Sequence, residues 1–254
     1  MRPLEGLSPE DRRSVVLAAL DGVTDPELDE SVTAMGFISK VEIDRGHVAV
    51  EFRLPTFWCS ANFAFLMAED MRIAVERLAW VETAIIRLVD HFAAESINRG
   101  VAEGLPFDAI FAGQATEGLA AIRRSFRQKA FLGRQEALLR PLIREHGTEA
   151  ALALTVAGLD RLCDGPDPER VAAARRYLAA RRHDGGAADA DAPAFTDLDG
   201  APVTAEGCAA HLRAIRGVRS AAEANAEMCR ILLTARYAAE TSVRTFEEKR
   251  EMSG

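Results

Sequence analysis

The stretch LPTFWCSANFAF, residues 54–65, places a cysteine where the hydrophobic pattern changes its period. The preceding HVAVEFRLP alternates apolar and polar residues as a strand does, and the residues that follow repeat at helical spacing. Cys59 is therefore expected at the start of a helix, where free backbone N–H groups and the helix dipole favour the thiolate. A thiolate is the nucleophilic and metal-binding form of cysteine. The alternative is that Cys59 is a small buried residue of the core.

Two carboxylates in the turn TDPEL form a second candidate site. Asp25 can cap a single helical turn that Pro26 opens, and Glu27 then complements the dipole, so the motif can be purely structural. In the functional interpretation, Asp25 and Glu27 lie near Cys59 as a base or as additional metal ligands. The sequence does not give that distance.

The other cysteines are weaker candidates. Cys208 and His211 lie three residues apart on a predicted helix and could face one metal ion, but no second close pair supports them. We interpret them as a packed cysteine beside a surface histidine. Cys163 and Cys229 occur in apolar helical contexts and are interpreted as core residues.

Basic residues cluster in the run IRRSFRQK, residues 122–129. Such a run is usually a solvated helix face, and the alternative is docking to an acidic partner through Arg123 and Arg127. A thiol enzyme would need a general base near Cys59, for which His47 and His91 are the nearest candidates in sequence. Neither histidine stands in a catalytic motif. The chain also has no P-loop, dinucleotide fingerprint, HExxH site or GxSxG elbow, so we expect no enzyme.

Composition and charge narrow the class of protein. The 254 residues are 48% hydrophobic and 28% charged, which is typical of a globular chain with a substantial core. The net charge is −8 in residues 1–104, +4 in 105–182 and −4 in 183–254. The acidic first segment argues against nucleic acid as a ligand. No apolar run is long enough for a membrane span, and the first residues lack a signal-peptide pattern, so a cytoplasmic location is expected.

The elements that must position Cys59 can be read from the pattern. Ser8 and Pro9 predict the start of a first helix, and 37–43 with 47–54 predict a hairpin around Asp44-Arg45-Gly46. A helix is expected from about Ser60 to Leu78. A strand should follow at 81–89 and pair with one hairpin strand, and a short helix is expected after it at 91–104. The fold class predicted is α+β: a small two-layer α/β domain (helix, hairpin, helix, strand) followed by an all-helical extension.

The predicted domain organisation has four parts. Residues 1–104 form the α/β domain, 105–182 a helical extension, 183–203 a linker and turn, and 204–254 the C-terminal helices. Within these parts, helices are predicted at the following ranges: 115–140, 148–163, 167–182, about 205–216 and about 219–248. The small, polar segment 183–194 is expected to be a mobile linker, and 196–204 a turn or tiny hairpin around Asp199-Gly200.

Taken together, VLAALDGVTDPELDESV, MGFISKVEI, HVAVEFRLPT and CSANFAFLMAEDMRIAVERL resemble one known family. Roughly residues 10–100 are similar to the SufT-like iron–sulfur cluster assembly domain, which is related to PaaD of phenylacetate degradation and to the cytosolic targeting factor of eukaryotes. The resemblance implies a small α/β fold and a role in maturing iron–sulfur or related metalloproteins. It places the family's reactive cysteine on Cys59, the acidic turn on Asp25 and Glu27, and the loop before the cysteine on Thr56.

The sequence departs from this family in two places. Asp90-His91-Phe92 stands where many relatives have a proline–tryptophan segment, and no CxxC-type zinc ribbon follows. We expect an accessory factor in the maturation of iron-containing enzymes, in which Cys59 carries an iron or iron–sulfur species transiently. Its expected partners are a client metalloenzyme and the iron–sulfur assembly machinery, and a homodimer is one candidate state. Neither nucleic acid nor a membrane is expected as a partner. The alternative is a metal-free structural adaptor that docks onto a metalloenzyme, for which a di-iron oxygenase system is one candidate.

Overall fold

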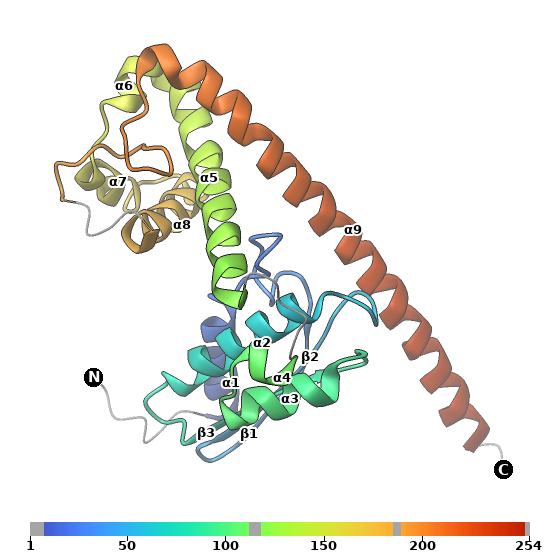
Figure 1. Cartoon of the computed structure of the whole chain (residues 1–254). Coiled ribbons are helices and arrows are strands. Elements are labelled where there is room, and N and C mark those ends of the chain that lie inside the picture. The colour runs from blue at the N-terminus through green and yellow to red at the C-terminus, as the bar shows by residue number, and fades with distance from the viewer. Residues whose placement is uncertain (1–7, 112–117, 185–188, 252–254) are drawn as a thin grey trace. The chain divides into compact units, whose positions relative to one another are not determined.

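The computed structural model describes residues 8–111, 118–184 and 189–251 (Figure 1). The chain divides into two compact units. Unit 1 lies within Met1–Ala120 and Ala224–Gly254, and unit 2 is Ala121–Glu223. The C-terminal residues therefore belong to the same unit as the N-terminal α/β elements. The four-part division expected from the sequence stays a prediction.

The first helix, α1, spans Pro9–Asp21 and starts as predicted. The Ser8 side chain accepts a hydrogen bond from the Asp11 N–H at 3.1 Å, and the Asp11 carboxylate accepts one from the Ser8 N–H at 3.1 Å. This reciprocal capping box, with proline at the first helical position, satisfies donors that the helix itself cannot. Val16 and Leu20 are fully buried and hold α1 on the core.

A three-stranded sheet in the order β1-β2-β3 supports the site. Strand β1 (Ile38–Asp44) pairs antiparallel with β2 (His47–Arg53), and β3 (Thr83–Val89) pairs parallel to β2. Both the hairpin and the third strand occur where the alternation predicts them. Because β2 and β3 are parallel, the loops that follow their carboxyl ends leave from the same edge of the sheet.

Helices cover the buried face of this sheet. Helix α2 (Ala61–Glu76) crosses from β2 to β3, and α3 (Ala94–Glu103) and α4 (Phe107–Ile110) follow β3. Gly104 ends α3 with φ +66°, a left-handed conformation that glycine adopts freely. The core of unit 1 is built from the apolar face of each element, for example Leu20, Val50, Phe65, Met71 and Ile97. The predicted two-layer α/β fold is confirmed.

Unit 2 is helical, as expected for the extension. Its helices are α5 (Gly118–His146), α6 (Thr148–Leu152), α7 (Val156–Leu162) and α8 (Pro168–Asp184). Helix α5 continues past the predicted end at residue 140 and through Pro141. The prolyl ring costs one backbone hydrogen bond, and the burial of Leu139 and Leu142 on either side offsets that loss. Residues 112–117, which include the start of the predicted 115–140 helix, lie outside the described residues.

The single helix predicted over 148–163 is wrong, because the chain breaks between α6 and α7. Thr155 is extended, caps α7 by accepting a hydrogen bond from the Gly158 N–H at 3.3 Å, and forms an isolated bridge with Pro193. The sequence predicts a mobile linker over 183–194, and the bridge shows that the end of this segment is instead attached to unit 2. Residues 185–188 lie outside the described residues. Residues 189–194 pack against α7, and Ala194 and Phe195 are buried. The predicted turn at 196–204 is present as a Thr196–Pro202 bridge.

The last helix, α9, spans Ala205–Glu251 without interruption, so the two helices predicted at 205–216 and 219–248 are one. Gly217 lies at the predicted break, but one glycine inside a helix costs only about 1 kcal/mol relative to alanine. The helix begins in unit 2 and continues into unit 1. Across the described ranges, none of the helices is both long and apolar enough to span a membrane.

Candidate functional site

Cys59 lies in the loop between β2 and α2, one residue before the N-cap Ser60. The predicted position at a strand-to-helix switch is therefore confirmed. Its side chain is half-buried, and its Sγ lies 3.1 Å from the Thr56 Oγ1. The hydroxyl can donate to a sulfur that is ionised and accept from one that is protonated. The structure thus brings two of the predicted site residues, Cys59 and Thr56, into direct contact.

His91, which follows β3, fixes the backbone of this loop. The imidazole Nδ1 accepts a hydrogen bond from the Ala93 N–H at 3.1 Å, so the proton of the neutral ring is on Nε2. Nε2 donates to the Cys59 carbonyl oxygen at 2.8 Å. Burial lowers the pKa of His91, which keeps the ring in this neutral form. The imidazole therefore holds the peptide of Cys59, and it does not face the sulfur as a general base would.

Exposed aromatic rings surround the cysteine loop. Phe57 is 50% exposed, Trp58 75% and Phe92 57%, and the Phe57 and Phe92 rings lie 6.5 Å apart. A hydrogen bond from the Phe92 N–H to the Phe57 carbonyl oxygen, at 3.0 Å, joins the two loops that carry them. We call these three side chains the aromatic rim. Large exposed apolar side chains grouped beside a reactive group are typical of a protein-binding surface.

The acidic turn folds as its sequence predicts. Asp25 is only 7% exposed, and its Oδ1 accepts hydrogen bonds from the N–H groups of Glu27 at 2.9 Å and Leu28 at 3.0 Å. Burial nevertheless raises the pKa of Asp25 to about 6, because the two N–H donors offset only part of the lost hydration. Glu27 is exposed. The capping interpretation is confirmed, and it leaves a carboxyl group that changes charge close to neutral pH.

Cys229 of α9 links the acidic turn to the cysteine loop. Burial, together with the smaller effects of the negative charges of Asp25, Cys59 and Glu27, raises the pKa of its thiol to about 11. All three groups are therefore within electrostatic reach of one sulfur atom. The functional interpretation of TDPEL requires the turn and Cys59 to share a neighbourhood, and their common electrostatic effect on Cys229 is consistent with that requirement. The role of the turn at this site stays a prediction.

Reasoning from the sequence missed Cys229 as a member of this site. The thiol packs against the core of unit 1, as expected, and it also experiences the charges of both candidate elements. One available signal was the helical spacing of Ala226, Cys229, Leu233 and Arg236, which puts the four on one face of α9. The spacing indicates that this face of α9 is buried, but it does not indicate which other elements the face packs against.

Part of the chain that contains this site matches a known protein family. Residues 13–86 match the iron-sulfur cluster assembly protein family. The matched segment runs from α1 into β3 and contains Asp25, Glu27, Thr56 and Cys59. The resemblance inferred from the residues is thereby confirmed for this segment, which we call the assembly domain, and it supports a role in iron–sulfur cluster assembly or maturation. No curated protein matches the chain.

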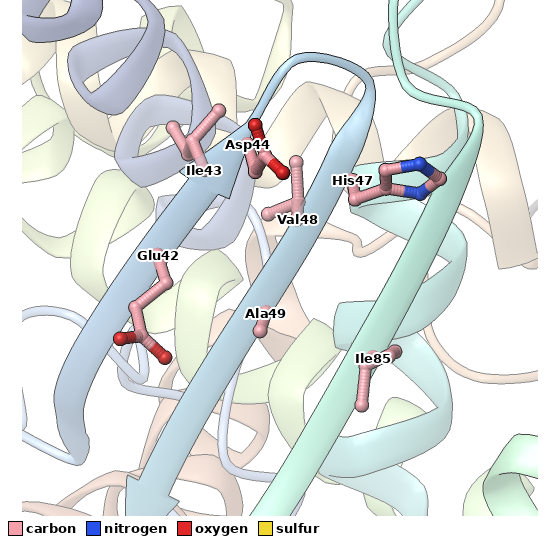
Figure 2. A pocket seen from close by; sticks show the side chains of 7 residues that line it. All are labelled: Glu42, Ile43, Asp44, His47, Val48, Ala49 and Ile85. Carbon is pink, nitrogen blue, oxygen red and sulfur yellow. The ribbon is translucent and has the colours of Figure 1, made fainter.

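The assembly domain also has a hollow outside the cysteine loop, and Figure 2 shows the side chains that line it. It is at the hairpin end of the sheet and is lined by Glu42, Ile43, Asp44, His47, Val48, Ala49 and Ile85. Strand β2 starts at His47 in this hollow and ends at Arg53, after which the cysteine loop begins. His47 Nδ1 lies 2.6 Å from the Thr83 Oγ1. His47, the other candidate base, is thus at the opposite end of β2 from Cys59.

The remaining candidates lie in unit 2. Cys208 is buried, as expected. The prediction of a surface position for His211 is wrong, because His211 is half-buried and its Nε2 is hydrogen-bonded to the side-chain oxygen of the buried Gln135. Cys163 is half-buried against the core of this unit. On α5, Arg127 is exposed and Arg123 is half-buried. Docking of a partner to these two arginines stays a prediction.

The chemistry available around Cys59 is that of a partial ligand set. Within the described ranges, no three or more His, Cys, Asp or Glu side chains are grouped so that they could hold a metal ion. A closed thiolate site for zinc or iron uses four ligands, and the cysteine loop supplies one half-buried sulfur. If iron binds here, the other ligands must come from the incoming species, from a partner or from a rearrangement of the neighbouring groups.

Proposed function

We propose that this protein is an accessory factor in the maturation of iron–sulfur or other iron-containing enzymes. In this role Cys59 binds an iron or iron–sulfur species as cargo and passes it to a client enzyme, so the protein is not a catalyst with turnover. The observation that carries the proposal is the half-buried Cys59 thiol, held on an ordered loop inside the assembly domain.

A relay needs a ligand that binds cargo and also lets it go. A single thiolate binds a cluster through one bond, and glutathione, a partner's residues or a second copy of this chain would complete the coordination. The Thr56 hydroxyl, 3.1 Å from the sulfur, orients that ligand. The carboxyl groups of Asp25 and Glu27 supply oxygen ligands or negative charge to the same neighbourhood.

A relay must also touch its client close to the cargo. The aromatic rim supplies that surface, because its rings are exposed and border the loop that carries Cys59. Burial of such rings on binding is a strong source of affinity in protein interfaces. The same surface would serve a metal-free adaptor, so the two proposals differ in the role of the thiol.

Anaerobic affinity isolation of the wild-type protein and of Cys59→Ala separates them. Partners are identified by mass spectrometry, and bound iron is measured in the same samples. The relay predicts iron and an iron-containing partner that are both lost with Cys59. Retention of the same partner by the variant, with iron in neither sample, contradicts the relay and favours the adaptor.

A further inference from the structure

Arg236 of α9 joins the helix to both loops that leave the carboxyl edge of the sheet. One guanidinium nitrogen donates to the Leu54 carbonyl oxygen at 2.9 Å, and the other to the Asp90 carbonyl oxygen at 3.1 Å. The same guanidinium lies 3.8 Å from the Asp90 carboxylate. Leu54 opens the loop that carries Cys59, and Asp90 opens the loop that carries His91.

Three more contacts lie along the same face of α9. Arg230 pairs with Glu30, at the end of the acidic turn, across 3.7 Å. Ala226 and Leu233 are buried in the core of unit 1. The Leu233 side chain packs over Gly36, where an added Cβ would lie 3.5 Å from it. The helix segment therefore lies over the acidic turn at one point and over the cysteine loop at another.

We propose that residues 226–236 of α9 form a cover that limits access to Cys59 and opens when the arginine contacts break. We call this segment the cover. The role of the cover in controlling a thiol that carries cargo rests on the proposed function. The proposal that the cover can move does not depend on that function. Cys229 lies next to Arg230 on the cover and moves with it.

The attachment is suited to opening. Two side chains of the cover are buried apolar residues, Ala226 and Leu233, and its two arginine contacts are partly open to solvent. Both acceptors of Arg236 are backbone carbonyls of the loops that carry the aromatic rim. A partner that binds the rim and shifts either loop would misalign these hydrogen bonds, since they depend on the positions of two separate carbonyl oxygens.

Thiol alkylation of the full chain tests the cover. Wild type and Arg236→Ala are treated with limiting N-ethylmaleimide, anaerobically and with a chelator, and each cysteine is followed by mass spectrometry of its peptide. Arg216→Ala is the matched control, because Arg216 is an exposed residue of the same helix. Cys163 of unit 2 serves as the internal reference.

The cover predicts that Arg236→Ala speeds alkylation of Cys59 and Cys229 by about tenfold or more, because the loss of a single charge-assisted hydrogen bond already accounts for that factor, while Cys163 keeps its rate. Unchanged rates at Cys59 and Cys229 overturn it. If circular dichroism shows that Arg236→Ala is unfolded, Arg236→Lys decides in the same way, because lysine keeps the charge but cannot donate from two forked nitrogens. The assay contains no iron, so a negative result here leaves the proposed function standing.

Discussion

Replacement of Asp25 by asparagine should stabilise the protein above pH 6 and leave it unchanged near pH 4. The carboxyl is buried, and its pKa is raised from the ordinary 3.8 to about 6. A group with a raised folded-state pKa binds its proton more tightly in the folded protein. The contribution of this proton to the free energy of unfolding is complete below pH 3.8 and is lost as the pH rises to about 6.

The size of this effect follows from the pKa difference. At 1.36 kcal/mol for each pH unit, the interval from 3.8 to about 6 amounts to about 3 kcal/mol. The asparagine side chain retains an oxygen that can accept from the N–H groups of Glu27 and Leu28, so the turn keeps its hydrogen bonds. We therefore expect Asp25→Asn to gain up to about 3 kcal/mol of unfolding free energy at pH 8.

Urea denaturation of both proteins between pH 4 and pH 8 measures this difference. Glu27→Gln is the matched control, because Glu27 is an exposed carboxylate of the same turn and its replacement should change stability by less than about 0.5 kcal/mol. A stability difference that does not vary with pH would falsify the assignment of Asp25 as a buried titrating group. A less stable Asp25→Asn at pH 8 would contradict it as well.

Three further substitutions test other parts of the structure. His91→Ala should lower the unfolding free energy by about 2–3 kcal/mol and His91→Gln by less, because glutamine can still donate to the Cys59 carbonyl. Trp58→Ala should change stability by less than about 0.5 kcal/mol but reduce the partner recovered by affinity isolation, since the ring is 75% exposed. Tyr177→Phe should cost about 1–3 kcal/mol, because its buried hydroxyl donates to the Ala194 carbonyl.

Each has a result that counts against it. Equal losses for the two His91 variants, by urea denaturation, would mean that the hydrogen bond to the cysteine loop is unimportant. Undiminished partner recovery with Trp58→Ala would remove the aromatic rim from the binding surface. An unchanged melting temperature for Tyr177→Phe would show that residues 189–196 contribute little to unit 2.

The local features of the fold could be predicted because their causes are local. Ser8 and Asp11 satisfy the first donors of α1, and alternation in residues 37–54 leaves one face of a hairpin apolar. The change from period two to helical spacing at Cys59 is visible for the same reason. The family match, residues 13–86, begins within α1 and covers both the hairpin and the change of period at Cys59.

The rest depends on contacts between residues far apart in the chain. The chain breaks between α6 and α7, where Thr155 pairs with Pro193, although the local apolar pattern around Thr155 continues without a break. Cys229 joins the candidate site because α9 contacts Glu30, which follows the acidic turn, and Leu54, which opens the loop that carries Cys59. Hydrophobic spacing identifies a buried helix face, but the partner of that face follows from tertiary packing.

Anaerobic reconstitution with ferrous iron, sulfide and a thiol reductant tests the central claim most directly. Iron and acid-labile sulfide are measured per chain for the wild type, Cys59→Ser and the control Cys163→Ser, together with visible absorption. The account predicts that the wild type and Cys163→Ser acquire iron and sulfide with visible charge-transfer bands, and that Cys59→Ser does not. Equal iron and sulfide in all three proteins would contradict the assignment of Cys59 as the cargo ligand.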